Sequence, residues 1–252
     1  MVHILFQRRV STFRKILFCW AAVLCVPSVA RLAAQNRAAQ SEVPVRSVAA
    51  DSAKRSLRYL EIGAGANAYR GDLTKGYEKW SSSVHFGLLF NRRERFNGHL
   101  NLAIGTITGQ NPAYAFDGEP GAVSAPNRFF RTPFFALNYD LHFNILKTDR
   151  WIVYVSQGIG IVRFKPKDDL GRALQENLAT RPPGETYNNV SVILPSQAGV
   201  TYLFGNGYGV GVRSGWLNPQ TDYLDNISQW GNRLKKDNAL WVRFHFAVPL
   251  GR

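Results

Sequence analysis

The chain has 252 residues, a formal net charge of +14 and 45% hydrophobic residues, enough for one sizeable folded domain. Beyond its N-terminal segment it contains no run of about 20 apolar residues, which excludes a bundle of transmembrane helices. Half of the basic excess lies in residues 1–56, which hold 9 Lys and Arg against 2 Asp and Glu. No nucleic-acid recognition motif accompanies the remaining charge, which therefore suits an anionic lipid surface or an acidic partner and not nucleic acid.

Residues 1–34 have the pattern of an export signal. Basic side chains within residues 8–15 precede an apolar run, 16–30, and small residues follow, so we expect cleavage after Ala30 or Ala34. A retained anchor helix is the alternative interpretation of the same segment. Residues 35–56 are rich in Ala, Ser, Gln and Val without periodicity, and we interpret them as a periplasmic N-terminal tail.

Both cysteines, Cys19 and Cys25, lie inside the predicted signal. The mature chain would then contain no disulfide and no thiolate metal site, and we expect it to carry no cofactor.

From residue 57 onward, large apolar residues recur at every second position, which is the period of a β-strand. In FALNYDLHFNIL (135–146) the odd positions are apolar, and the positions between them, from Ala136 to Asn144, are small or polar. Each segment is long enough to cross a bilayer as a tilted strand, for which about 9–11 residues are needed. The expected strands are 57–70, 80–90, 96–107, 135–146, 151–164, 190–204, 208–216 and 240–250.

The connections between these strands alternate between short and long. This alternation is typical of outer-membrane barrels, which have tight turns on the periplasmic side and long loops outside the cell. We therefore predict an all-β fold over residues 57–252: an eight-stranded antiparallel up-and-down transmembrane β-barrel, with both mature termini periplasmic. The short connections are 91–95, 147–150 and 205–207, and the long ones are 71–79, 108–128, 165–189 and 217–239.

A soluble exported β-sandwich is the rival interpretation, because its strands alternate too. Two features weigh against it. The apolar faces of 135–146 and 240–250 are unusually large, and the polar faces are rich in Gly and Ala, which a narrow lumen needs and a solvated face does not.

An eight-stranded barrel is just wide enough for its own side chains, so we expect a filled lumen and not a pore. Buried charges must be paired or hydrated, which predicts an ion-paired polar plug on the inward faces. A metal-binding or proton-linked cluster of imidazoles is the alternative, provided that the four histidines lie at matching heights. The expected polar plug comprises Glu61, Asp140, Arg213, Arg243, His85, His99, His142 and His245.

Sequence signals for catalysis are weak. No G-x-S-x-G or H-E-x-x-H motif occurs, although Ser83 and His85 share one strand face, as a lipid-modifying barrel enzyme would require near the membrane interface. We therefore expect no enzymatic activity.

A group of basic residues lies on two of the short turns. On the periplasmic side it would either be solvated beside lipid headgroups or form a docking surface for an acidic periplasmic partner. This basic turn surface comprises Arg92, Arg93, Arg95, Lys147 and Arg150.

Four segments, in order along the chain, resemble a Bacteroidota outer-membrane barrel family that includes PorG of the type IX secretion system. The first, 59–73, resembles the opening strand of that family, with Asn67 in place of a glycine. The others are 131–146, 153–167 and the loop 221–228. The matching positions are Glu61, Gly63, Tyr69, Gly71, Asp72 and Leu73 in the first segment and Thr221, Asp222, Tyr223 and Asp225 in the last.

The resemblance implies an outer-membrane barrel in contact with lipid and lipopolysaccharide, associated with PorK-like and PorN-like periplasmic ring proteins that anchor the secretion machinery. The alternatives are surface adhesion through the long loops or lipid modification. One departure is the C-terminus, which ends PLGR where barrels usually end on an aromatic residue; Phe246 or Leu250 is the candidate substitute.

Overall fold

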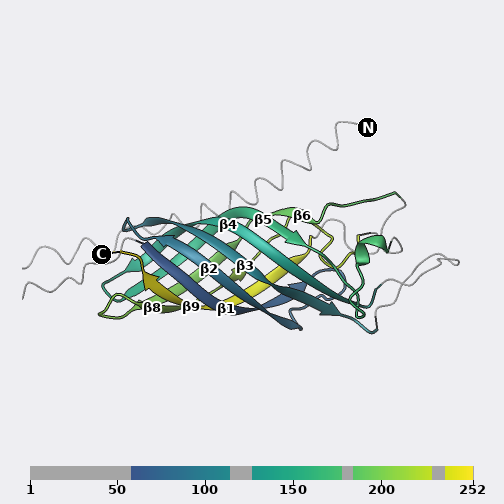
Figure 1. Ribbon diagram of the computed structural model, residues 1–252, viewed down its shortest axis with the longest axis horizontal. Coiled ribbons are helices and arrows are strands. Elements are labelled where there is room, and N and C mark those ends of the chain that lie inside the picture. Colours follow the sequence, from purple (N-terminus) through teal and green to yellow (C-terminus); the bar gives the residue numbers. More distant parts are fainter. Residues whose placement is uncertain (1–57, 114–126, 178–183, 229–235, 252) are drawn as a thin grey trace, which may run out of the picture. The chain divides into compact units, whose positions relative to one another are not determined.

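The computed structural model describes residues 58–113, 127–177, 184–228 and 236–251 (Figure 1). The predicted signal (1–34) and the predicted periplasmic tail (35–56) lie outside the described residues. Within the described ranges the only helical element is a 3₁₀ turn, η1 (Leu174–Glu176). None of the helical structure in this part of the chain is long and apolar enough to cross a membrane.

The strands form one closed antiparallel barrel. Consecutive strands pair, except that β6 and β7 run one after the other along β5 as a single interrupted strand. The pairing of β1 with β9 closes the ring. The ring therefore has eight strands, and the predicted fold is confirmed; in Figure 1 the strands run obliquely to the long axis of the barrel. The bounds are β1 (Arg58–Arg70), β2 (Trp80–Phe90), β3 (Phe96–Gln110), β4 (Phe129–Lys147), β5 (Trp151–Phe164), β6 (Val190–Ile193), β7 (Ser196–Leu203), β8 (Gly209–Trp216) and β9 (Asn238–Pro249).

Strand bounds agree closely with the periodicity, with two differences. Strand β4 begins at Phe129, earlier than the expected 135, because β3 continues to Gln110 and pairs with it there. The expected strand 190–204 is interrupted at Leu194 and Pro195, since proline has no N–H to donate to the ladder.

Side chains alternate between the two faces of the barrel wall as the period predicts. Along β4, four odd-numbered side chains are 39–49% exposed, whereas the even-numbered side chains between and beside them are at most 2% exposed. The exposed set is Phe135, Leu137, Tyr139 and Leu141, and the buried set is Ala136, Asn138, Asp140 and His142. Each of the eight barrel strands carries at least one large apolar side chain on this outer face, and the buried charged side chains lie inside together with two apolar clusters.

Glycines on the inner face leave room for imidazole rings from the neighbouring strand. A Cβ atom at any of three glycines would collide with the ring beside it. Small and large residues thus alternate across the lumen, as a narrow barrel requires. The pairs are Gly63 with His85, Gly87 with His99, and Gly211 with His245.

Side chains satisfy the backbone at the interruption between β6 and β7. The carbonyl of Leu194 accepts hydrogen bonds from Gln157 Nε2 at 3.3 Å and Asn218 Nδ2 at 3.0 Å. The carbonyl of Pro195 accepts one from Gly158 N at 2.8 Å. Unpaired backbone groups in hydrocarbon cost several kcal/mol each, so these contacts make the interruption compatible with lipid.

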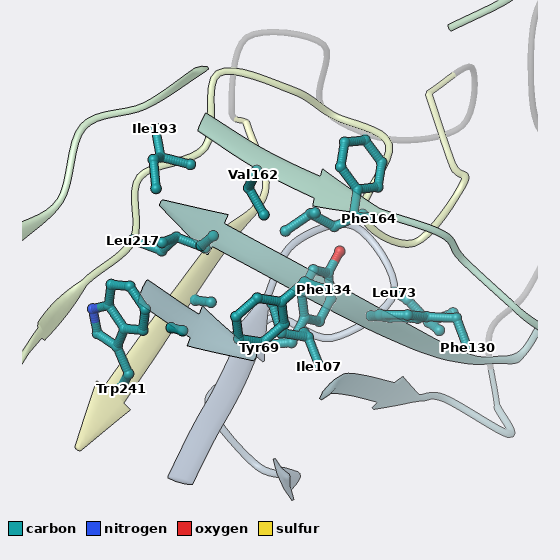
Figure 2. Packing of buried hydrophobic residues seen from close by; sticks show 14 of the residues in the cluster. Tyr69, Leu73, Ile107, Phe130, Phe134, Val162, Phe164, Ile193, Leu217 and Trp241 are labelled. Atoms are coloured by element: carbon teal, nitrogen blue, oxygen red, sulfur yellow. The ribbon is translucent and has the colours of Figure 1, made fainter. Parts of the chain in front are cut away.

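The described parts of the long loops pack into one end of the barrel (Figure 2). Leu73, Leu217 and Leu224 come from these loops and are at most 1% exposed. They belong to one apolar cluster with strand residues such as Tyr69 and Phe130, whose rings meet edge-to-face at 4.7 Å. The loops are therefore part of the folded core at this end.

Substituting Gly63 by Ala should destabilise the barrel, because the new methyl group would overlap the His85 ring and the carbonyl of Phe244. Overpacking of this kind typically costs about 1–3 kcal/mol. Gly205→Ala is the matched control, since nothing lies within 4 Å of a Cβ placed there. Urea unfolding of both variants in phospholipid vesicles checks this, and equal midpoints would contradict it.

Candidate functional site

The centre of the lumen is a network around Glu61. Arg213, from β8, forms an ion pair with this carboxylate. His99 Nε2 and His245 Nε2 lie 3.2 Å and 3.7 Å from its oxygens. All four side chains come from different strands and lie on the inner face, at most 4% exposed.

A second carboxylate, Asp140, completes this network. Its oxygens accept hydrogen bonds from Asn138 Nδ2 at 2.6 Å and Gln197 Nε2 at 3.2 Å. His99 Nδ1 lies 3.4 Å from Asp140 Oδ2, so the His99 ring lies between the two lumen carboxylates. His99 and His245 therefore lie at matching heights along the barrel axis, a relation that the sequence could not establish.

The remaining members of the expected polar plug also face the lumen. Arg243 lies over the Trp241 ring, 3.2 Å from its centroid, and its Nη1 is 3.4 Å from Asn101 Oδ1. His142 stacks on Tyr154 with ring centroids 4.2 Å apart. His85 packs against Gly63, and neither of its ring nitrogens has a hydrogen-bond partner among the described residues.

One part of the network has the composition of a metal site. Single donor atoms of His99, Asp140 and His142 all lie within 4.8 Å of one another. However, Arg213 Nη1 lies 3.4 Å from His99 Nδ1, and the two lumen carboxylates are already balanced by two guanidinium groups. A divalent cation would add uncompensated charge to a buried, neutral network, so the arrangement fits an ion-paired plug better than a metal centre.

Ser83 and His85, the pair with catalytic residue types, lie inside the barrel. Ser83 Oγ donates to Asn67 Oδ1 at 3.2 Å, and His85 is 0% exposed. Neither side chain reaches the outer face, so the pair is not placed to meet a lipid substrate.

The basic turn surface lies at the short-turn end, where the described barrel begins and ends. Its arginines (Arg92, Arg93, Arg95 and Arg150) are exposed, whereas Lys147 is half-buried. Lys147 Nζ donates to the carbonyl of Arg93 at 2.8 Å and thereby joins the two turns.

Two asparagines fix the backbone of the first basic turn. Asn97 Nδ2 donates to the Arg93 carbonyl at 2.8 Å, and its Oδ1 accepts from Arg93 N at 2.9 Å. Asn144 Nδ2 donates to the Glu94 carbonyl at 2.8 Å. The exposed arginines are therefore held on a defined turn.

The structure also joins two segments that the family resemblance singled out separately. Tyr69 Oη, from β1, lies 2.6 Å from Asp225 Oδ2 in the β8–β9 loop, and Leu73 N donates to the same oxygen at 3.3 Å. A Cβ on Gly71 would collide with the Tyr69 hydroxyl, so this position admits only glycine without rearrangement. Glu61 and Gly63, from the first segment, lie instead in the lumen.

The other loop positions of the resemblance lie beside this contact. Tyr223 N donates to Thr221 Oγ1 at 3.3 Å, and the Tyr223 hydroxyl is bonded to Glu185. Burial, together with the nearby carboxylates of Asp72 and Glu185, raises the pKa of Asp222 to about 7.

Sequence reasoning missed Asp237, which completes the group. Its Oδ1 lies 2.6 Å from Tyr69 Oη, and its Oδ2 accepts from Leu224 N at 2.8 Å. The only sequence feature that marks Asp237 is its place directly before β9, at the end of a long loop. The alternation of apolar and polar residues identifies strand faces and gives no information about loop residues.

Comparison with family models and with curated proteins gives no match. Among solved structures the chain is similar to Neisserial surface protein A, at 10% identity and a TM-score of 0.47, covering 77% of this chain and 98% of that one. It is also similar to the attachment invasion locus protein of Yersinia pestis (9% identity, TM-score 0.44, 77% and 97% covered). A third similar structure is the outer membrane enzyme PagL, at 13% identity and a TM-score of 0.36, covering 75% of this chain and 99% of that one. These likenesses say nothing of function, and the fold rests on the strand pairing itself.

Replacing Glu61 by Gln should destabilise the barrel strongly, because Arg213 would remain buried without its counter-charge. Removing one partner of a buried pair typically costs about 3–5 kcal/mol. The double variant Glu61→Gln, Arg213→Met, which removes both charges, should recover much of this loss. Urea unfolding in vesicles measures all three proteins. A double variant as unstable as the single one would show that charge pairing is not what holds this network.

Proposed function

We propose that this protein is a non-enzymatic outer-membrane barrel that serves as a structural anchor for periplasmic proteins. The observation that carries the proposal is the polarity of the barrel wall: every barrel strand exposes at least one large apolar side chain on its outside, and the buried charges lie inside. A soluble barrel needs the opposite arrangement. A closed sheet leaves no edge unpaired, which is the condition for a strand structure to lie in lipid.

The filled lumen supports an anchoring role over a transport role. Two arginines, two carboxylates and four histidines occupy the inner face, each at most 4% exposed. Moving a solute through this network would require breaking buried ion pairs, which is strongly unfavourable.

The basic turn surface supports docking of an acidic periplasmic partner. In outer-membrane barrels the short turns face the periplasm, and here they carry exposed arginines on a fixed backbone. The family resemblance suggests the partner: PorK-like and PorN-like ring proteins of a type IX secretion system. The docking surface and the anchored ring would together make this barrel a structural component of that machinery.

A lipid-facing wall predicts that Leu137→Arg destabilises the protein. Leu137 lies in the middle of β4 and is 39% exposed on the outer face. Arginine facing the bilayer midplane costs about 2–4 kcal/mol, whereas an exposed surface change in a soluble protein stays within about 0.5 kcal/mol. Leu170→Arg is the control, because Leu170 is 72% exposed in a long loop. Urea unfolding in vesicles distinguishes the two cases, and equal effects at both sites would rule out the lipid-facing wall.

Docking through the short turns predicts that charge reversal of Arg92, Arg93 and Arg95 to Glu leaves the barrel folded but releases the partner. Like charges facing each other weaken an interface by several kcal/mol, so recovery should fall on the order of tenfold or more. The measurement is a crosslinked pull-down from outer membranes, with PorK-like and PorN-like proteins quantified by mass spectrometry.

The matched control makes the same charge change at the long-loop end, at Arg128, Arg131 and Lys165, which are also exposed. This control should leave recovery unchanged. Equal recovery with both triple variants would reject the basic turn surface as the docking site. Recovery of the barrel alone, from wild type as well, would reject the secretion role and leave the outer-membrane barrel without a periplasmic partner.

A further inference from the structure

We propose that Tyr69, Asp225 and Asp237 form an acid-closed latch, which holds the long loops on the end of the barrel at low pH and weakens as the pH rises. The proposal is independent of the anchoring role, because the latch lies at the long-loop end and the basic turn surface lies at the other.

The geometry of the latch calls for a second proton. Tyr69 Oη lies 2.6 Å from Asp225 Oδ2 and also 2.6 Å from Asp237 Oδ1. A phenol hydroxyl has one proton to donate, and ionised carboxylates can only accept. One of the two contacts therefore has no proton unless a carboxyl group is itself protonated. The closed arrangement holds a proton that two free aspartates at neutral pH would not.

The backbone contacts indicate which oxygen carries that proton. Asp225 accepts from Ile227 N at 2.8 Å and from Leu73 N at 3.3 Å, so both of its oxygens receive a backbone N–H. Asp237 Oδ2 accepts from Leu224 N at 2.8 Å, but its Oδ1 faces the tyrosine hydroxyl. The second proton is best placed on Asp237 Oδ1, donated to Tyr69 Oη, while Tyr69 donates to Asp225.

The surrounding charges favour protonation. Burial raises the pKa of Asp237 well above its ordinary value, with added repulsion from the carboxylates of Asp225, Asp222 and Asp72. Burial likewise raises the pKa of Asp225 to about 7, against the lowering effect of its hydrogen bonds.

Two further groups act on this cluster from neighbouring segments. Glu185, in the loop after β5, is bonded to Tyr223 and raises the pKa of Asp222. Lys236, immediately before Asp237 in the chain, lowers the pKa of Asp222 and so opposes its protonation. Acidic groups thus outnumber basic ones around the latch among the described residues.

The direction of the pH effect follows from the raised pKa values. The closed latch binds more protons than the open one between the ordinary aspartate pKa of about 4 and the raised value. The stabilisation is complete below about pH 4 and is lost as the pH rises from there through the raised pKa of Asp237, the group that carries the second proton. Each proton involved changes the opening equilibrium about tenfold per pH unit.

The latch holds apolar packing in place. Leu73 and Ile227 come four and two residues after Tyr69 and Asp225, respectively, and are at most 1% exposed within the apolar cluster of the long-loop end. Thr132 Oγ1 donates to the Leu224 carbonyl at 2.6 Å, which joins the same loop to β4. Opening of the latch would therefore release both loop segments from the barrel end while the β-ladder remains paired.

Hydrogen exchange of the whole protein in phospholipid vesicles tests this proposal. Amides of residues 71–74 and 221–228 are followed between pH 5 and 9, with rates corrected for intrinsic exchange, and amides of β2 and β3 serve as the reference. We expect opening of the two loop segments to increase about tenfold or more per pH unit between pH 5 and 7, relative to the reference strands. Loop protection that does not change with pH would overturn the proposal.

The variant Asp237→Asn sharpens the test. Its amide group can donate to Tyr69 Oη where the carboxyl proton would, and its carbonyl oxygen can still accept from Leu224 N. This variant should keep the loops closed at pH 8. Because it lacks one titrating proton, the opening of its loops should rise with pH less steeply than in wild type, by a factor of about ten per pH unit. Asp169→Asn, an exposed aspartate at the same end, is the control and should behave as wild type. An Asp237→Asn slope equal to that of wild type would also reject the latch, and if this variant does not assemble, the wild-type series decides alone.

Discussion

Closure of the β-ladder is the constraint on which the rest of this structure depends. Once β4 pairs with β5 and β1 pairs with β9, the sheet has no free edge, and the side chains of its wall face either inward or outward. The outward set can then be uniformly apolar. The inward set must fill a narrow space, so its charges have to neutralise one another there. The pairing of Glu61 with Arg213 follows from this confinement.

The sequence predicted the wall well, because alternation is a local signal that closure preserves. Strands β2 and β5 have the expected bounds, and the outward and inward residues of β4 were assigned correctly. The inner position of Asp140 follows from the same period, but its nearness to His99 depends on the register between β3 and β4, which no local pattern determines.

The long-loop end was not predictable in the same way. Tyr69 and Asp225 are 156 positions apart, and Asp237 lies beyond a further segment, so their meeting requires the barrel to be closed first. The family resemblance singled out Tyr69, Gly71 and Asp225 without a reason. The structure supplies one: the glycine leaves space for the tyrosine hydroxyl, and the tyrosine reaches the loop carboxylate.

The interruption at Pro195 gives the barrel a seam. Here the backbone bond from Gly158 N to the Pro195 carbonyl is supplemented by the side-chain amides of Gln157 and Asn218, which both bind the Leu194 carbonyl. Side-chain bonds are fewer and more easily exchanged than a ladder. The boundary between β5 and the β6–β7 strand therefore depends partly on side-chain amides, and parting it would also break the hydrogen bond that Gln197 donates to Asp140 of the lumen network.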